Sequence, residues 1–435
     1  MNFINNKDFS EKVSFKEATL NGLARDKGLY VPENIPVMPN SFFESIEKLD
    51  DFELSFQVMF PYVKDSLAGE ELRQILKETL SFPIPVVGIS KNVYALELFH
   101  GPTQAFKDVG ARFMSRCLSQ FSSQHNNITV LVATSGDTGS AVAHGFYNVK
   151  GVTVIILFPK GKISLFQEYQ MTTLDNNIHP VEVDGTFDDC QVSIKQALND
   201  RNLNSQMQLS SANSINIARL LPQMLYYFLA YKQLKSRIKN KKWIVSVPSG
   251  NFGNLTAGLF AGKMGLPVYK FVAANNANDT FYQFWKTGEY IPKPSVVTYS
   301  NAMDVGAPSN FDRIMHIYQG NYKAIKNDIL AGSFSDKATL KEIRETYLET
   351  KYILDPHGAV GLLALKQYSD DNTLGLFLET AHPGKFGSVV KKAIPTYPIR
   401  EVSLNNCSKA TINNSYDCLL QEIKRYIQQA IRRKI

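Results

Sequence analysis

One lysine stands in the stretch HGPTQAFKDVG, residues 100–110 of a chain of 435 residues. Lys107 directly follows the aromatic Phe106 in a segment otherwise poor in charge, and the helical pattern ARFMSRCLSQF begins just after it. Most lysines are solvated surface residues, so the residue type alone predicts no chemistry. A lysine at a junction between a loop and a helix becomes a candidate nucleophile only if other parts of a site surround it.

A glycine-rich stretch, VPSGNFGNLTAG at residues 247–258, follows an apolar run and opens a helical pattern. Gly250 and Gly253 permit backbone conformations that a side chain forbids, so these residues and the asparagines between them can direct N–H groups at one anion. We predict a phosphate-binding loop here, although a glycine-rich turn without a ligand fits the same residues. The stretch is neither a Walker loop nor GxGxxG.

The loop TSGDTG, residues 134–139, also lies between an apolar run and a helical pattern. Thr134, Ser135 and Thr138 supply hydroxyls, and the backbone N–H groups at the predicted helix start favour a carboxylate ligand. Asp137 is unfavourable beside an anion. The alternative is that Asp137 or Thr138 merely caps the helix.

A third stretch, SANSINIARLLPQ at residues 211–223, combines short hydrogen-bonding side chains with a planar cation. Asn213 and Ser214 precede a predicted helix that carries Arg219, and this combination suits a phosphoryl group. Read alone, the same residues describe a helix cap followed by a surface arginine. The three stretches and Lys107 together predict one site with a reactive lysine and two anion pockets, which are features of pyridoxal phosphate enzymes.

Seven stretches carry a resemblance to a known family. They are SFKEATLNGLARDKGLYVPE, ELFHGPTQAFKD, ATSGDTGSAV, SVPSGNFGNLTAG, SNAMDVGAPSNF, DPHGAVG and LETAHPGKF. In this order along the chain they resemble the threonine synthase family of fold-type II pyridoxal phosphate enzymes, in its longer variety with an extra N-terminal lobe. The chain departs from the usual family residues at Gln104, Gly358 and Gly384, none of which is assigned to chemistry.

The resemblance assigns roles to individual residues. Lys107 matches the family's Schiff-base lysine, and Thr380 matches the hydroxyl residue that faces the pyridine nitrogen. At the position of Asp137, shorter relatives carry an asparagine that touches the cofactor's ring hydroxyl. The remaining family positions are Phe106 beside the cofactor, Gly250, Asn251, Phe252, Gly253 and Asn254 around its phosphate, Thr134, Ser135 and Thr138 at the substrate carboxylate, and Asn213, Ser214 and Arg219 at the substrate phosphate.

The resemblance implies that O-phospho-L-homoserine and water give L-threonine and phosphate, the last step of threonine biosynthesis, with pyridoxal 5'-phosphate as the cofactor. One alternative is a paralogous pyridoxal phosphate lyase or serine/threonine dehydratase. It would share Lys107 and the GNFGN loop without needing a second anion pocket, so Arg219 discriminates between the two. A more remote alternative is a non-catalytic binding protein on the same fold.

The elements that must position these residues alternate along the chain. From residue 127 onward, short apolar runs rich in β-branched residues are each followed by a helical pattern, which predicts parallel sheets buried on both faces. We expect an α/β fold of the tryptophan-synthase-β-like architecture. Its predicted parts are an N-terminal lobe (1–85), a smaller domain with the lysine and the carboxylate loop (86–220) and a larger domain with the phosphate loop (221–435), with soft, interleaved boundaries.

Composition excludes several other classes of protein. The net charge of +7 is spread along the chain, and its densest basic cluster, YIQQAIRRKI, reads as one face of a last helix, so we expect no nucleic-acid role. The four cysteines form no CxxC pair, so neither a metal site nor a disulfide framework is expected. We expect no membrane segment, a cytoplasmic location, and a monomer or homodimer.

Overall fold

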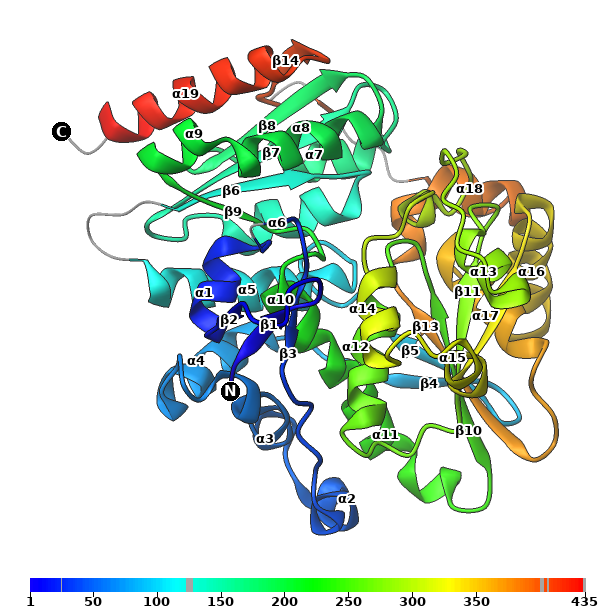
Figure 1. The fold of residues 1–435 in the computed structure, drawn as a ribbon. Helices are drawn as coiled ribbons and strands as arrows, with labels where there is room; N and C mark the ends of the chain where they lie inside the picture. The colour runs from blue at the N-terminus through cyan, green and yellow to red at the C-terminus, as the bar shows by residue number, and fades with distance from the viewer. Residues whose placement is uncertain (25, 123–127, 400–402, 405–406, 433–435) are drawn as a thin grey trace.

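A computed structural model describes residues 1–435 except residues 25, 123–127, 400–402, 405–406 and 433–435. The side chains of residues 427–432 are also outside the described part, so the basic cluster YIQQAIRRKI lies largely outside it. Figure 1 shows two sheets, each covered by helices, and a separate N-terminal lobe that lies against both of them.

The first sheet has five parallel strands in the order β14-β8-β7-β6-β9. The strands are β6 Ile128–Ala133, β7 Val152–Pro159, β8 Ile178–Asp184, β9 Gln208–Ser211 and β14 Ala410–Asn413. The surrounding helices are α5 Lys107–Phe121, α6 Asp137–Phe146, α7 Leu165–Thr172, α8 Phe187–Asn199, α9 Arg201–Gln206 and α19 Tyr416–Arg432. In β6, Val130 and Val132 share a core with α5, α6 and α7, whereas Leu131 and Ala133 share one with α8, α9 and α19. Both faces are therefore buried.

The second sheet has six strands in the order β12-β11-β10-β13-β5-β4, and only the β4–β5 pair is antiparallel. The strands are β4 Val86–Ser90, β5 Val93–Glu97, β10 Lys242–Pro248, β11 Lys270–Asn275, β12 Ile329–Ser333 and β13 Thr373–Glu379. The helices are α10 Ile217–Leu220, η2 Leu221–Gln223, α11 Met224–Ile238, α12 Gly253–Lys263, α13 Thr280–Thr287, η3 Asn301–Met303, α14 Phe311–Ile317, α15 Tyr322–Asp328, α16 Asp336–Thr350, α17 Pro356–Lys366, η4 Pro383–Phe386 and α18 Gly387–Ala393. Val245 in β10 packs with α11 and α12, and its neighbour Ile244 packs with α16 and α17.

The N-terminal lobe combines a small antiparallel sheet with four α-helices and a 3-10 turn. Its elements are β1 Phe3–Asn5, β2 Lys12–Val13, α1 Phe15–Asn21, β3 Tyr30–Pro32, α2 Asn40–Ser45, η1 Ile46–Lys48, α3 Asp51–Val63 and α4 Gly69–Thr79. Ser14 and Glu17 form a capping box that starts α1. The Phe15 ring then packs against two phenylalanines of α5, Phe113 and Phe121, at centroid distances of 6.4 and 6.1 Å. The lobe therefore supports the helix that begins at Lys107.

The predicted α/β class and the parallel sheets are confirmed. The chain passes between the two sheets more than once, because β4 and β5 (86–97) lie in the six-stranded sheet and β14 (410–413) lies in the five-stranded one. The strands therefore do not divide at residues 86 and 221, and the division of the chain into three domains stays a prediction.

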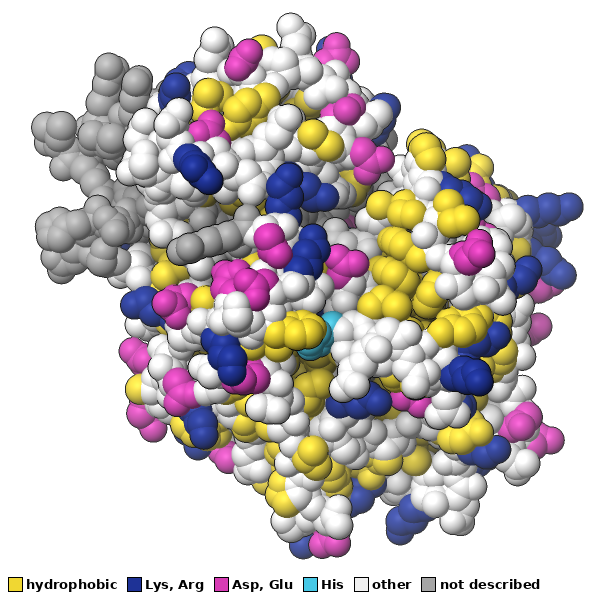
Figure 2. Space-filling view, in the orientation of Figure 1, with side chains coloured by type: hydrophobic (Ala, Val, Ile, Leu, Met, Phe, Trp, Pro, Cys, Tyr) yellow, Lys and Arg dark blue, Asp and Glu magenta, His cyan; other side chains and the backbone are white. Residues whose placement is uncertain are grey.

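In the described residues, no helix is both long enough and apolar enough to cross a membrane. On the face drawn in Figure 2, Lys and Arg side chains are interspersed with Asp and Glu side chains. The described part of this face therefore presents mixed charge rather than a continuous basic stripe.

Candidate active site

A pocket lies where strands of both sheets end. Ala133 ends β6, Pro248 ends β10 and Thr380 follows β13, and all three residues line the pocket. Loops and helix N termini converge at the carboxyl ends of parallel strands, so polar groups gather there. Every residue that the sequence predicted for the site lines this pocket except Thr134.

Lys107 is the first residue of α5, and the loop before it is bound to the segment that follows β13. The Phe106 N–H donates to the Thr380 carbonyl oxygen at 2.9 Å, and the His382 N–H donates to the Gln104 carbonyl oxygen at 3.0 Å. Gln104 has the left-handed φ of +57° that turns the loop toward the strand. These bonds bring Lys107 and Thr380, far apart in the sequence, into one pocket.

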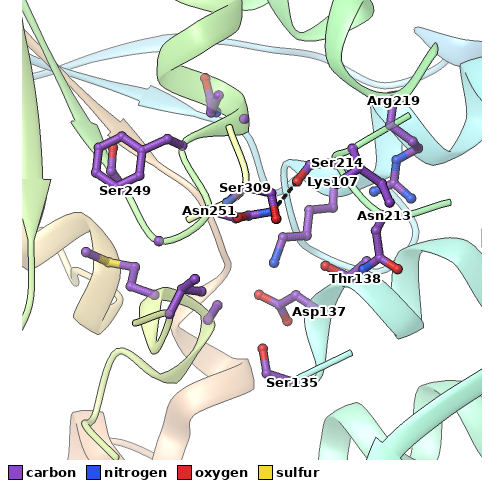
Figure 3. Close-up of a pocket in the computed structure, with 18 of the residues that line it drawn as sticks. Lys107, Ser135, Asp137, Thr138, Asn213, Ser214, Arg219, Ser249, Asn251 and Ser309 are labelled. Carbon is purple, nitrogen blue, oxygen red and sulfur yellow. Dashed lines mark hydrogen bonds between the residues drawn. The ribbon is translucent and has the colours of Figure 1, made fainter. Parts of the chain in front are cut away.

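The Lys107 side chain extends into the middle of the pocket with its amine toward Asp137, while Arg219 lies on the other side (Figure 3). Burial lowers the pKa of Lys107 from 10.5 to about 8; the attraction of Asp137 opposes this shift, and the positive charges of Lys385 and Arg219 add to it. An amine with this pKa is partly neutral near pH 7. It can therefore act as a nucleophile and as a base.

Thr134 lies beneath the TSGDTG loop and holds its backbone. Its hydroxyl oxygen accepts hydrogen bonds from the Gly136 N–H at 2.9 Å and the Gly139 N–H at 2.8 Å. Gly136 has a φ of +133°, and a Cβ at this position would lie 2.3 Å from the Gln167 side chain. Thr134 thus shapes the loop, and the structure does not bring its hydroxyl to the pocket wall.

Asp137 is the first residue of α6 and the N-cap is Gly136, so the alternative that Asp137 or Thr138 is the cap is wrong. The free N–H of Gly139 at this helix start is bound by the Thr134 hydroxyl instead. Asp137 Oδ1 lies 2.7 Å from Lys385 Nζ and accepts a hydrogen bond from Gln167 Nε2 at 3.0 Å. Burial would raise the pKa of Asp137, but Lys385 and Lys107 hold it well below its usual range. The loop therefore presents a carboxylate together with the pocket-lining Ser135 and Thr138.

The glycine-rich loop adopts its shape differently from the prediction. The left-handed residue is Phe252, the N-cap of α12 with a φ of +60°, and neither Gly250 nor Gly253 has a positive φ. Gly250 is required for space instead, because a Cβ there would lie 2.7 Å from Met303 Cα and 3.0 Å from the Ala302 carbonyl oxygen. The expectation that both glycines supply unusual backbone angles is therefore wrong.

Asparagine side chains hold this loop against residue 214. Asn251 Nδ2 donates to Ser214 Oγ at 2.7 Å (dashed in Figure 3), and Asn251 Oδ1 accepts from the Ser309 N–H at 2.6 Å. Asn310 Nδ2 donates to the same Ser214 oxygen at 3.2 Å. Because Ser214 Oγ accepts both bonds, its own proton is left to donate to a ligand in the pocket.

The first turn of α12 offers donors to an anion. Tyr227 donates to Asn254 Oδ1 at 2.5 Å, whereas Asn254 Nδ2 is buried and has no partner within the described residues. The backbone N–H groups of Gly253 and Asn254 are also at the helix start, where no intrahelical acceptor exists. A phosphate group would satisfy these donors.

Arg219 supplies a second anion-binding group. It is buried, so the surface-arginine alternative is wrong. Its Nη1 donates to the Ala212 carbonyl oxygen at 2.7 Å, while Nε has no partner among the described residues. Burial lowers its pKa to about 10, so it remains a cation at neutral pH. Asn213 is less available, because its amide bonds the N–H and carbonyl of Ala133 at 3.1 and 2.7 Å.

Arg313 in α14 was not predicted from the sequence. Its guanidinium is fully buried and donates to the carbonyl oxygens of Tyr30, Ser214 and Ile215 and to Asn310 Oδ1. Burial lowers its pKa to about 9. It joins β3 of the N-terminal lobe to the residues that hold the glycine-rich loop. The only available signal was its position just after the family stretch SNAMDVGAPSNF.

Lys385 and Asp304 were also missed, although both lie in stretches that carry the family resemblance. Lys385 is fully buried against Asp137. Asp304 Oδ1 accepts bonds from Asn276 Nδ2 at 2.9 Å and from Thr298 Oγ1 at 2.7 Å, and burial raises its pKa to about 6. This network fixes the segment that brings Met303 to the pocket. Sequence spacing does not reveal such partners, because they come from distant elements.

These residues fit pyridoxal phosphate. Lys107 offers an amine with a lowered pKa, the start of α12 offers unsatisfied donors for a phosphate, and the Thr380 side chain lines the same pocket. Four cations, those of Lys107, Lys385, Arg219 and the nearby Arg313, outnumber the two carboxylates of Asp137 and Asp108, so an anionic ligand would offset the excess positive charge.

Comparison with known proteins agrees with this chemistry. The family model described as "Pyridoxal-phosphate dependent enzyme" matches residues 81–377, and the model "Threonine synthase N terminus" matches residues 2–80. The chain is 44% identical to the threonine synthase of Buchnera aphidicola subsp. Baizongia pistaciae over 396 residues, which cover 91% of each chain.

Two solved structures are similar over nearly the whole chain. Threonine synthase from Escherichia coli has a TM-score of 0.92 at 39% identity and covers 98% of this chain and 100% of its own. The pyridoxal phosphate-bound threonine synthase from Brucella melitensis has a TM-score of 0.90 at 30% identity and covers 98% and 99%. The chain therefore belongs to the threonine synthase family of pyridoxal phosphate-dependent enzymes.

Proposed function

We propose that the pocket converts O-phospho-L-homoserine and water into L-threonine and phosphate. This proposal rests on the buried Arg219, which lines the same pocket as Lys107 and the α12 loop. In the described part of the chain, Arg219 Nε has no hydrogen-bond partner. Two separate sets of anion donors suit a site that binds two phosphate groups, one on the cofactor and one on the substrate.

In this proposal the start of α12 and the residues 250–254 hold the cofactor phosphate, and Lys107 is the amine that binds the cofactor covalently. Phe106, Asp137 and Thr380 complete its surroundings. When bound, pyridoxal phosphate supplies an aldehyde carbon for amines and a conjugated ring that delocalises negative charge. Thr380 contributes a neutral hydroxyl, which stabilises a protonated ring nitrogen less than a carboxylate would.

Lys107 is the base of the proposed reaction. After the substrate amine takes its place, its free amine is positioned to remove the proton from the substrate Cα, and its lowered pKa leaves it partly unprotonated for this task. Because the same amine then carries a proton, it can return that proton to the substrate. Removal of a Cβ proton, departure of phosphate from Cγ, transfer of a proton to Cγ, addition of the water hydroxyl at Cβ and return of a proton to Cα complete the conversion to threonine.

The remaining polar residues position the substrate. Ser135 and Thr138 at the start of α6 are the proposed contacts for its carboxylate, with Thr134 shaping the loop beneath them. Arg219 and the Ser214 hydroxyl are the proposed contacts for its phosphate, and Asn213 lies next to them. Phosphate held by Arg219 after its release is a candidate for activating the attacking water.

A lyase or dehydratase that releases a keto acid and ammonia would use Lys107 and the α12 loop without a second cation. The burial of Arg219 favours the phosphate-releasing reaction, because an arginine without a ligand is costly to bury. We also propose that the enzyme works in the cytoplasm, where the thiols of its four free cysteines would stay reduced.

The proposal is tested by incubating the holoenzyme with O-phospho-L-homoserine and measuring threonine, 2-oxobutyrate and phosphate separately. We expect threonine and phosphate in equal amounts. Phosphate accompanied by 2-oxobutyrate instead of threonine would show net elimination and refute the proposed reaction. The Lys107→Ala variant serves as the inactive control, because it lacks both the covalent attachment and the base.

A further inference from the structure

Lys385, in η4, is a buried lysine to which the proposed reaction assigns no task. Its side chain is fully buried, and its Nζ lies 2.7 Å from Asp137 Oδ1 and donates to the Thr103 carbonyl oxygen at 2.7 Å. Thr103 is itself held by Asp108, which accepts bonds from the Thr103 N–H at 2.9 Å and hydroxyl at 2.6 Å. The Lys385 amine is therefore held by both Asp137 and the Thr103 carbonyl oxygen, and it cannot easily turn away from Asp137.

Asp137 is placed between two lysines but is bound to only one of them. In the described part of the chain its direct partners are Lys385 and Gln167, and Lys107 interacts with it through longer-range attraction. Figure 3 shows the Lys107 amine turned toward this carboxylate. If Lys385 were absent, Lys107 would be the nearest remaining cation for Asp137.

We propose that Lys385 is a positioning residue that keeps Asp137 occupied, so that Lys107 remains an unpaired and partly neutral amine. An amine paired directly with a buried carboxylate would be held in its charged form, which is neither a nucleophile nor a base. This inference rests on the proposed role of Lys107 as the amine that binds pyridoxal phosphate.

The charged groups around Lys107 come from three elements: Asp137 from α6, Lys385 from η4 and Arg219 from α10. Lys385 in turn faces the carboxylates of Asp137 and Asp108. Removing Lys385 therefore changes the environment of Lys107 in two ways that have the same sign. It removes a positive charge that opposes protonation, and it releases a carboxylate that favours protonation.

The test measures how fast the full-length protein, freed of cofactor, captures pyridoxal phosphate at saturating concentration as a function of pH. Borohydride reduction and peptide mass mapping identify the lysine that carries the label. In Lys385→Met, the apparent pKa of capture should rise by at least about one pH unit over the parent, which means about tenfold slower capture near pH 7. Lys385→Gln should show the same direction if the methionine variant does not fold.

The decisive variant is Lys385→Met combined with Asp137→Asn. If Lys385 acts by occupying Asp137, removing both charges should return the pH profile of capture toward that of the parent protein. A merely structural role predicts no such rescue. Lys366→Met is the matched control, because Lys366 also pairs with a buried carboxylate, Glu342, but lies on α17 away from the pocket.

Two results would overturn the inference: an unchanged profile in both single variants, or a double variant shifted as far as the single one. Failure of the proposed function looks different. In that case the parent protein itself would not be labelled at Lys107, whereas a labelled parent with unshifted Lys385 variants would refute only the role of Lys385.

Discussion

Gly110 in α5 and Arg219 in α10 are in direct backbone contact. A Cβ on Gly110 would lie 2.7 Å from the Arg219 carbonyl oxygen and 3.2 Å from Arg219 Nε, the nitrogen that lacks a partner in the described part of the chain. Since α5 begins at Lys107, the same helix positions the reactive amine and limits where the guanidinium can lie. The position of α5 therefore affects both Lys107 and the second anion site at Arg219.

The Gly110→Ala substitution should displace Arg219. Overpacking of this kind costs about 1–3 kcal/mol of stability, because the nearest atom is backbone and cannot move aside easily. We expect kcat/KM for O-phospho-L-homoserine to fall while pyridoxal phosphate is still captured by Lys107. Gly262→Ala in α12 is the matched control, since its Cβ would meet only Phe271 at 3.5 Å. Equal activity of both variants would contradict the link.

Arg219→Ala tests the second anion site directly. A charge-assisted hydrogen bond to an oxyanion contributes about 1.5–3 kcal/mol, so kcat/KM should fall about tenfold or more. The variant should keep its cofactor and its absorption spectrum, and inorganic phosphate should inhibit it much less than the parent. Arg73→Ala, which removes an exposed ion pair with Glu53, is the control. Loss of cofactor with unchanged turnover would place Arg219 in the cofactor site instead.

The sequence predicted the fold well because its signals are local. Apolar runs bounded by glycine, serine and proline mark buried parallel strands wherever helices cover both faces, and β6, β7, β10 and β13 all follow this rule. Local signals do not predict which sheet each strand joins, so the passage of the chain between the two sheets could not be predicted from the sequence. Strands such as β14 join their sheet through pairing partners more than two hundred residues away.

The site was predicted less completely, for physical reasons that differ by residue. Residues in short loops, such as Ser135 and Asn251, were predicted to lie together and do line one pocket, because loop chemistry is visible in the sequence, while their contacts with ligands stay predictions. Thr134 bonds the loop backbone and does not line the pocket, and the sequence could not show this because a hydroxyl that holds a loop and one that holds a ligand look alike. Lys385 and Arg313 were missed because their partners, Asp137 and Tyr30, come from distant segments.

Gly250→Ala should weaken cofactor retention. Its Cβ would lie 2.7 Å from Met303 Cα, so either the glycine-rich loop or the segment 301–306 must shift. Because the donors at the start of α12 depend on this loop, we expect pyridoxal phosphate to dissociate faster, as measured by loss of absorbance on dialysis. Gly262→Ala is again the matched control, because a Cβ on Gly262 would meet only Phe271 at 3.5 Å. Unchanged retention in Gly250→Ala would show that the phosphate binds elsewhere.

Lys107→Met should make the cofactor-free protein more stable at neutral pH. Burial lowers the pKa of Lys107 from 10.5 to about 8, so below pH 8 the folded protein holds a charge that the unfolded chain solvates better. This shift corresponds to a penalty on the order of 3 kcal/mol. The penalty is fully present below the folded pKa and disappears as the pH rises from about 8 to 10.5, where the unfolded chain also loses the proton.

Urea unfolding of the two cofactor-free proteins should therefore show a difference in the free energy of unfolding at pH 7 that narrows toward pH 10. Lys391→Met, at an exposed lysine, is the control and should change this free energy little. A variant that is less stable than the parent at pH 7 would show that Lys107 is held by a direct ion pair, contrary to the arrangement with Lys385.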